Sequence, residues 1–182
     1  MTVKPRLTEA DKQAAAKRLG VKLSALKAVC DVESRGTGFL SDGNAVILFE
    51  RHVMYRQLKK NGIDADSFAE CQPDIVNRFA GGYLGGLREW PRLNDACLIH
   101  RPSALESASW GLFQLMGFHW ELLGYPSVES FVTDMQSSEG RQLNAFCTFI
   151  MKNPQRHKAL QGLRFAEFAR LYNGADYQKN KD

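Results

Sequence analysis

The stretch at residues 23–52, LSALKAVCDVESRGTGFLSDGNAVILFERH, sets the expected architecture because its hydrophobic period changes partway along. Its first part repeats at helical spacing, and one helix face carries Leu23, Leu26, Val29, Cys30 and Glu33. After Gly36 this period disappears, and an Asp42-Gly43 turn pair precedes the strand-like run AVILFE. The stretch therefore predicts a helix with Glu33 on its apolar face, followed by a small β-hairpin.

Helix signals dominate the sequence on both sides of this stretch. Thr8, three residues before Asp11, predicts the start of a first helix, and Gly20 predicts its end. Further helix boundaries are indicated at Asn61-Gly62, Pro91, Ser103 and Ser127, and two buried helices by the runs QLNAFCTFIMKN, closed by Pro154, and RFAEFARLYNG, closed by Gly174. The expected fold class is therefore mainly α.

The bulk composition fits one ordinary globular domain. The chain has 182 residues, of which 44% are hydrophobic and 24% charged, and no repeat or linker divides it. We therefore expect residues 1–182 to form a single domain without a separate binding module, and to be monomeric. The glycine-rich segment at 81–86 lacks the order of a phosphate-binding loop, so a hinge or a close helix crossing is expected there.

Several classes of partner and cofactor are disfavoured. The net charge is +4, but the basic residues are scattered among 20 acidic ones, so nucleic-acid binding is not expected. Neither the four histidines nor the four cysteines have metal-ligand spacing, so we expect no metal or other cofactor, and reduced core thiols at Cys30, Cys71, Cys97 and Cys147. No apolar run has the length of a signal peptide or membrane span, which predicts a cytoplasmic protein without stable membrane insertion.

Glu33 is the first candidate for chemistry. A carboxylate on an apolar helix face is costly to ionise, because desolvation favours the neutral acid and raises its pKa. That property suits a general acid. The same spacing equally allows a helix-terminal glutamate that pairs with Arg35 or points to water.

Asp42 and Glu50 are the nearest candidates for a second catalytic carboxylate. Asp42 belongs to an Asp-Gly turn, and such an aspartate often only bonds local backbone amides. Glu50 shares a face with Leu48 and His52 if the run is extended. It then either projects into a cleft or forms a buried pair with Arg51 or His52.

Three separated motifs resemble those of the lysozyme superfamily: Val32-Glu33-Ser34, Ser109-Trp110-Gly111-Leu112-Phe113-Gln114-Leu115-Met116 and Leu171-Tyr172-Asn173-Gly174. They are similar to segments of goose-type lysozymes, of lytic transglycosylases and of the N-acetylmuramidase domain of phage endolysins. The resemblance implies a lysozyme-like fold, in which two helical lobes flank a cleft beside a small β-hairpin.

The resemblance also implies roles for individual residues. Glu33 would protonate the glycosidic oxygen, Tyr172 would orient Glu33, and Asn173 would face the glycan. Ser109 and Gln114 would bind the sugar, since polar side chains gain little in a core. Packing is the better explanation for the apolar members of the second motif, and Tyr172 could instead make only a buried hydroxyl bond.

One spacing departs from the pattern of phage-type lysozymes. Those enzymes have a glutamate, eight residues, an aspartate, five residues and a threonine. Glu33 and Asp42 keep the first interval, but Leu48 stands where the threonine would be. Leucine cannot hydrogen-bond an attacking water, so the inverting mechanism of those enzymes is in question here.

The function implied by the resemblance is cleavage of the β-1,4 bond between N-acetylmuramic acid and N-acetylglucosamine in bacterial peptidoglycan. Such an endolysin would reach its periplasmic substrate only after a holin opens the inner membrane, and would then lyse the host. The motifs fit a lytic transglycosylase equally well, with Glu33 as acid and then base and an anhydromuramic product. A non-catalytic wall-binding module is a third hypothesis.

Overall fold

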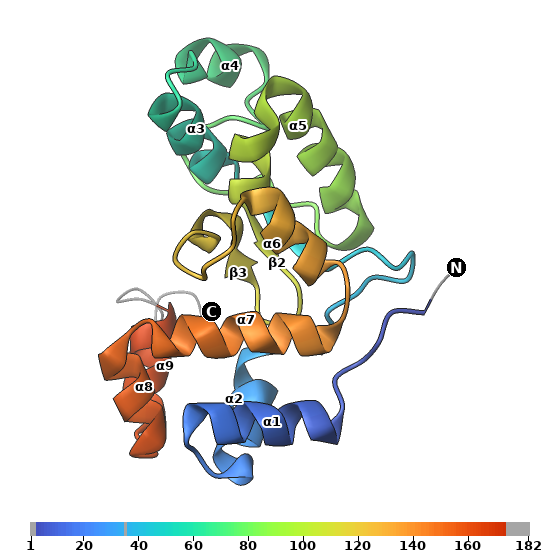
Figure 1. The fold of residues 1–182 in the computed structure, drawn as a ribbon. Coiled ribbons are helices and arrows are strands. Elements are labelled where there is room, and N and C mark those ends of the chain that lie inside the picture. Colours follow the sequence, from blue (N-terminus) through green and yellow to red (C-terminus); the bar gives the residue numbers. More distant parts are fainter. Residues whose placement is uncertain (1–2, 35, 174–182) are drawn as a thin grey trace.

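The computed structural model describes residues 3–34 and 36–173, which form a mainly helical fold with a small antiparallel sheet (Figure 1). The helices are α1 (Glu9–Leu19), α2 (Leu23–Glu33), α3 (Arg51–Lys60), α4 (Ala65–Cys71), α5 (Glu89–Glu106), α6 (Val128–Met135), α7 (Glu139–Met151), α8 (Pro154–Gln161) and α9 (Phe165–Asn173). The strands are β1 (Ile47–Phe49), β2 (Ala108–Trp110) and β3 (Leu115–Met116), and two 3₁₀ segments are η1 (Gly86–Arg88) and η2 (Gly117–His119). The expected fold class is confirmed.

Two groups of helices lie at opposite ends of the molecule with the sheet between them (Figure 1). One group contains α3, α4 and α5, and the other contains α1, α2, α8 and α9, with α7 running along its edge. The core is continuous through both groups, and its largest fully buried side chains are Trp110, Phe49, Phe131, Phe146 and Phe168. In the part of the chain described, no helix is long and apolar enough to cross a membrane.

The expected strand after residue 44 is present as β1, but most of its pairing is with a distant segment. The turn at Asp42-Gly43 closes with one bridge, Phe39↔Ala45. The ladder of β1 is formed with β2, in the register Ile47↔Trp110, Leu48↔Ser109 and Phe49↔Ala108, and β2 turns back tightly into β3. The second motif of the sequence thus lies against the segment that follows the first.

The helix boundaries predicted at Thr8, Gly20 and Ser127 are confirmed. Thr8 and Asp11 form a reciprocal capping box at the start of α1, and Gly20 ends it in the left-handed conformation. Ser127 caps α6 through the amide of Ser130.

The expected N-cap at Ser103 is wrong, because Ser103 lies inside α5. That helix is kinked at His100, whose φ and ψ are −159° and 104°. Pro102 has no amide to donate, which explains an interruption here. His100 then takes the capping place, and its Nδ1 lies 3.4 Å from the Ser103 amide and 2.8 Å from the Ser103 hydroxyl.

Two further expectations need correction. Of the two alternatives for the glycine-rich segment at 81–86, a hinge or a close helix crossing, the crossing is wrong: the segment is a loop that leads into η1 and α5, and at Gly81 and Gly82 it passes the Arg51 guanidinium. The four cysteines are free thiols, and Cys30 and Cys147 are buried, but Cys71 is exposed at the end of α4. Cys71 is the last residue of α4, and the buried residue of that helix is Ala65 at its start, so Cys71 is not a core thiol.

Candidate active site

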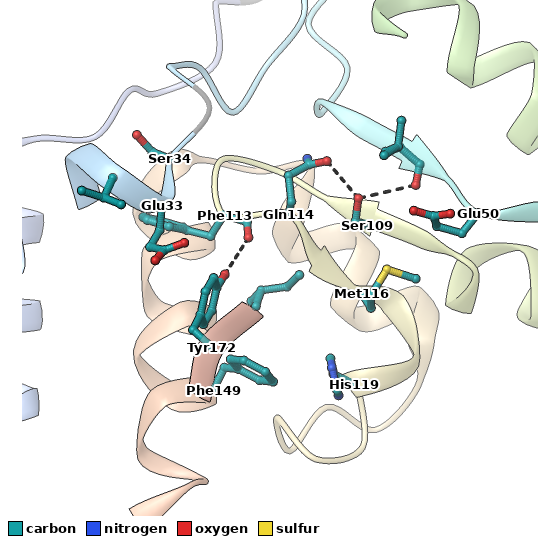
Figure 2. Close-up of a pocket in the computed structure, with 13 residues that line it drawn as sticks. Glu33, Ser34, Glu50, Ser109, Phe113, Gln114, Met116, His119, Phe149 and Tyr172 are labelled. Atoms are coloured by element: carbon teal, nitrogen blue, oxygen red, sulfur yellow. Dashed lines mark hydrogen bonds between the residues drawn. The ribbon is translucent and has the colours of Figure 1, made fainter. Parts of the chain in front are cut away.

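A pocket of about 780 Å³ opens between the small sheet and the helix group that contains α2 and α9 (Figure 2). Its walls come from six parts of the chain: the end of α2, strand β1 with the residue after it, the β2–β3 hairpin, η2, α7 and α9. The polar side chains that line it are Glu33, Ser34, Glu50, Ser109, Gln114, His119 and Tyr172. Most residues proposed from the sequence are therefore brought together by the fold.

Glu33 is half-buried at the last position of α2 and faces into the pocket (Figure 2). The helix is anchored in the core by the apolar residues of the same face, Leu26, Val29 and Cys30, which are buried. Ser34 is extended and its amide still bonds the Cys30 carbonyl, so the helix ends immediately after Glu33. The carboxylate is thus held at the end of a rigid element and at the edge of the pocket.

Tyr172 on α9 lies beside Glu33. Burial, followed by the nearby Glu33 carboxylate, raises the pKa of Tyr172 above its ordinary value. The phenol donates its one proton to the Phe113 carbonyl at 2.8 Å, and the ring stacks on Phe168 and meets Phe146 edge-on. Tyr172 therefore links α9 to the β2–β3 turn next to Glu33, and its role in orienting Glu33 remains a prediction.

Glu50 lies across the pocket from Glu33, with Ser109 and Gln114 between them (Figure 2). It is not on an extended strand with His52, because β1 ends at Phe49 and α3 begins at Arg51, which makes Glu50 the N-cap residue of α3. Its side chain is 17% exposed.

The Glu50 carboxylate accepts a hydrogen bond of 2.6 Å from the Tyr83 hydroxyl. His52 Nδ1 is 3.3 Å from the same oxygen but has no hydrogen-bond geometry. Burial lowers the pKa of His52 more than Glu50 raises it, so this imidazole is neutral at pH 7. Arg51 turns away towards the carbonyls of Phe79 and Ala80. Glu50 thus lines the pocket without a cationic partner among these neighbours.

Asp42 does not join this group. It is exposed in the turn before β1 and is absent from the lining of the pocket. Its two oxygens accept from the backbone amide of Asn44 at 3.0 Å and from the Asn44 side chain at 2.8 Å. The structure therefore gives Asp42 the local turn-forming interaction that its Asp-Gly context allows.

Ser109 and Gln114 line the pocket and bond each other, with the Ser109 hydroxyl 2.9 Å from Gln114 Oε1. The Gln114 amide nitrogen donates to the carbonyls of Gly111 and Val46, and its backbone has a positive φ of 50°. These donors already serve the β2–β3 turn, so the side chains offer a ligand mainly their oxygen lone pairs. Asn173 ends α9, and its side chain lies outside the described residues.

Gln142 on α7 supports this turn, a role that no motif in the sequence indicates. It is 1% exposed, accepts from the Leu112 amide at 2.7 Å, and donates to the Met135 carbonyl at 2.7 Å. Gly111 has a φ of 71°, and a Cβ there would lie 2.5 Å from Gln142 Cδ. Glycine is therefore required in the second motif by both conformation and contact.

The other end of the pocket is aromatic. His119 from η2 packs against Phe149 of α7, with ring centroids 4.9 Å apart, and against Phe118 at 4.5 Å. Burial, followed by the charge of Arg156, lowers the pKa of His119 to about 4. Near neutral pH this wall is uncharged, in contrast to the carboxylate end.

Comparison with known proteins places the chain in a family. The N-acetylmuramidase family model matches residues 22–181. The crystal structure of the Burkholderia AP3 phage endolysin superposes with a TM-score of 0.93 and 49% sequence identity, covering 100% of this chain and 69% of that one. An endolysin of Enterobacteria phage PRD1 is 31% identical over 91 residues, which cover 47% of this chain and 59% of that protein. By its match over most of its length, this chain belongs to the N-acetylmuramidase family found in phage endolysins.

Proposed function

We propose that this protein cleaves the β-1,4 bond between N-acetylmuramic acid and N-acetylglucosamine in bacterial peptidoglycan, with Glu33 as the general acid. The main support for this proposal is the position of Glu33 at the end of α2, where it faces Glu50 across a pocket of about 780 Å³. A pocket of this size suits sugar units, and a pair of carboxylates is what most glycoside hydrolases use.

The position of Glu33 favours an acid that keeps its proton. The last carbonyls of a helix carry partial negative charge, which opposes a second negative charge at that end. Half-burial adds a desolvation cost to the charged form. Glu50 accepts a hydrogen bond from Tyr83, which suits the charged partner of the pair. The two carboxyl groups thus have environments that suit different roles, Glu33 as acid and Glu50 as base or electrostatic stabiliser.

A lytic transglycosylase is the second candidate, and Leu48 favours it. Leu48 lines the pocket where phage-type lysozymes have a water-positioning threonine, and Asp42 lies outside the lining. In this alternative Glu33 acts as acid and then as base, and the muramyl 6-hydroxyl replaces water. Mass spectrometry of digested peptidoglycan separates the two, because only the transglycosylase leaves anhydromuramic ends.

The test of the proposal is Glu33→Gln, which keeps the side-chain volume and removes the transferable proton. We expect its rate on purified peptidoglycan to fall by roughly 10²- to 10⁴-fold, with the circular-dichroism spectrum unchanged. A folded variant that clears permeabilised cells at the wild-type rate would refute the assignment. A wall-binding module without turnover would instead leave turbidity unchanged for both proteins.

Asp42→Asn and Glu50→Gln test the second carboxylate. Asp42→Asn should keep most of the activity, because its carboxylate serves the turn. Glu50→Gln should be the more damaging of the two in a hydrolase and nearly neutral in a transglycosylase that needs Glu33 alone. Equal losses at both positions would contradict the assignment of Glu50.

In the phage life cycle, the proposal has this domain act as a monomer on periplasmic peptidoglycan once a holin has opened the inner membrane of the host. Cells that express the protein alone should keep it in the cytosolic fraction and lyse little. Co-expression of a holin should trigger lysis, and the Glu33→Gln variant should abolish that effect.

A further inference from the structure

The glycine-rich loop at 81–86 reaches the pocket through one side chain. Tyr83 donates to Glu50 Oε2 at 2.6 Å, although the two residues lie on separate elements and 33 positions apart in the chain. Among the described residues, this phenol is the one hydrogen-bond donor to the Glu50 carboxylate, since His52 Nδ1 lacks the geometry. Hydrogen bonds to a charged acceptor are short and about twice as strong as neutral ones.

The loop is held so that Tyr83 can make this bond. Glu89 is fully buried, and its Oε1 accepts from the amides of Leu84 at 2.6 Å and Gly85 at 2.8 Å. Its Oε2 accepts from the amide of Phe49, the residue before Glu50, at 3.2 Å. One buried carboxylate therefore fixes the residues that follow Tyr83 and the residue that precedes Glu50, which sets the distance between the two side chains.

The other side of the loop is fixed by Arg51. Its guanidinium donates to the carbonyls of Phe79 at 3.1 Å and Ala80 at 3.2 Å. At Gly82 a Cβ would approach this guanidinium to 3.2 Å, and the φ of 74° favours glycine as well. The glycines thus let the loop pass closely over Arg51 on its way to Tyr83.

Tyr83 keeps its proton under all conditions in which such an enzyme works. Burial, followed by the hydrogen bond to Glu50, raises the pKa of Tyr83 to about 12. The phenol is therefore a permanent hydrogen-bond donor to the Glu50 carboxylate. In the described part of the chain, the Glu50 carboxylate faces neutral His52 on α3 and Tyr83 on the loop. The buried Glu89–Arg92 pair of α5 bonds the backbone of the preceding residue, Phe49.

We propose that Tyr83 is a positioning residue of the active site, which holds Glu50 in one orientation towards the pocket, opposite Glu33. This role of Tyr83 rests on the proposed function, because it requires that Glu50 takes part in cleavage. It gives the glycine-rich loop a role that its sequence does not reveal. Tyr83 need not touch the glycan for this role, because it acts through Glu50.

The test is a double-mutant cycle of Tyr83→Phe and Glu50→Gln, with kcat and KM measured on soluble peptidoglycan fragments. Tyr83→Phe removes only the hydroxyl, and we expect kcat to fall roughly 10-fold with KM nearly unchanged, as for the loss of one charged hydrogen bond. In the Glu50→Gln background the same change should have almost no further effect. Glu50→Ala serves as a second background if Glu50→Gln proves unstable.

Tyr55→Phe is the matched control. Tyr55 on α3 also donates to a carboxylate, Asp66 Oδ1 at 2.7 Å, in the same helix group but outside the pocket lining. It should leave kcat unchanged. A Tyr83→Phe variant with wild-type kcat, or one with equal losses in both backgrounds, would overturn the inference. If Glu33→Gln is inactive while Glu50→Gln is fully active, the role of Tyr83 is refuted and the proposed function stands. If the wild-type protein cuts no glycan, the proposed function itself is refuted.

Discussion

Glu89→Gln is the substitution whose effect follows most directly from the structure. Glu89 is 0% exposed, and its two oxygens accept from four donors: the amides of Leu84, Gly85 and Phe49, and Arg92 Nη1 at 2.7 Å. Glutamine has nearly the same shape, but one oxygen becomes an NH₂ group. Whichever position the nitrogen takes, it then faces two donors, and Arg92, 5% exposed, loses its charged partner.

The cost can be bounded from the contacts. Removing one member of a buried ion pair costs about 3–5 kcal/mol, because the other charge stays buried without compensation. We therefore expect Glu89→Gln to lower the free energy of unfolding by about 4 kcal/mol, a large part of the typical 5–15 kcal/mol. For a chain of 182 residues this corresponds to a Tm lower by roughly 10 °C.

The effect should also depend on pH in a defined direction. Burial raises the pKa of Glu89, but the amides of Gly85 and Leu84, the Arg92 charge and the Phe49 amide together outweigh it and leave the pKa below its ordinary value. The folded pKa is thus the lower one, so the stabilisation is complete above the unfolded value of about 4.3 and is lost as pH falls through the folded value. The difference between wild type and variant should therefore shrink below about pH 4.

Urea unfolding followed by circular dichroism, at pH 7 and at pH 3.5, measures both quantities. Glu9→Gln is the control: Glu9 pairs with Lys12 and Lys27 on the surface, with its side chain 58% exposed, and its loss should leave the midpoint almost unchanged. A loss below about 1 kcal/mol for Glu89→Gln, as for an exposed pair, would refute the reasoning.

Two further predictions concern the walls of the pocket. Gly111→Ala should destabilise the fold by about 2–4 kcal/mol, through the positive φ and the contact with Gln142, whereas Gly124→Ala, which meets nothing within 4 Å, should cost only about 1 kcal/mol in urea unfolding. Equal losses of stability in the two variants would show that the Gln142 side chain moves away from the added methyl group at no cost. The folded pKa of His119, about 4, lies below its unfolded value, so wild type should lose about 1–2 kcal/mol of stability relative to His119→Gln between pH 7 and pH 4.5. Parallel pH–stability curves for the two proteins would contradict this.

Local signals in the sequence were enough to predict α1 and α2. The reciprocal hydrogen bonds of Thr8 and Asp11 join residues three positions apart, and the apolar residues of the stripe that ends at Glu33 recur every three or four positions. Interactions of such short range involve residues that are close in the sequence, so they can be recognised without knowledge of the tertiary structure. Ser103 shows the limit: it has the residue type of a cap, but Pro102 moves the break to His100.

The role of the strand after Asp42 depended on tertiary structure. The sequence indicated a strand, but its main partner β2 lies some sixty residues further along, at Ala108–Trp110. The same pairing places Leu48 opposite Ser109, and so joins the first and second motifs in one pocket wall. No periodicity in the sequence specifies such a partner.

The sequence by itself determined the helical class, the position of Glu33 at a helix end, and the motifs that identify the family. Only the tertiary structure separated Glu50 from Asp42, which have the same chemistry and lie eight positions apart. Glu50 faces the pocket because β1 is paired with β2 and Tyr83 approaches from a loop fixed by Glu89. The Tyr83–Glu50 bond and the β1–β2 pairing at Leu48 and Ser109 join residues 33 and 61 positions apart, and they form only when burial of the shared core brings the segments together.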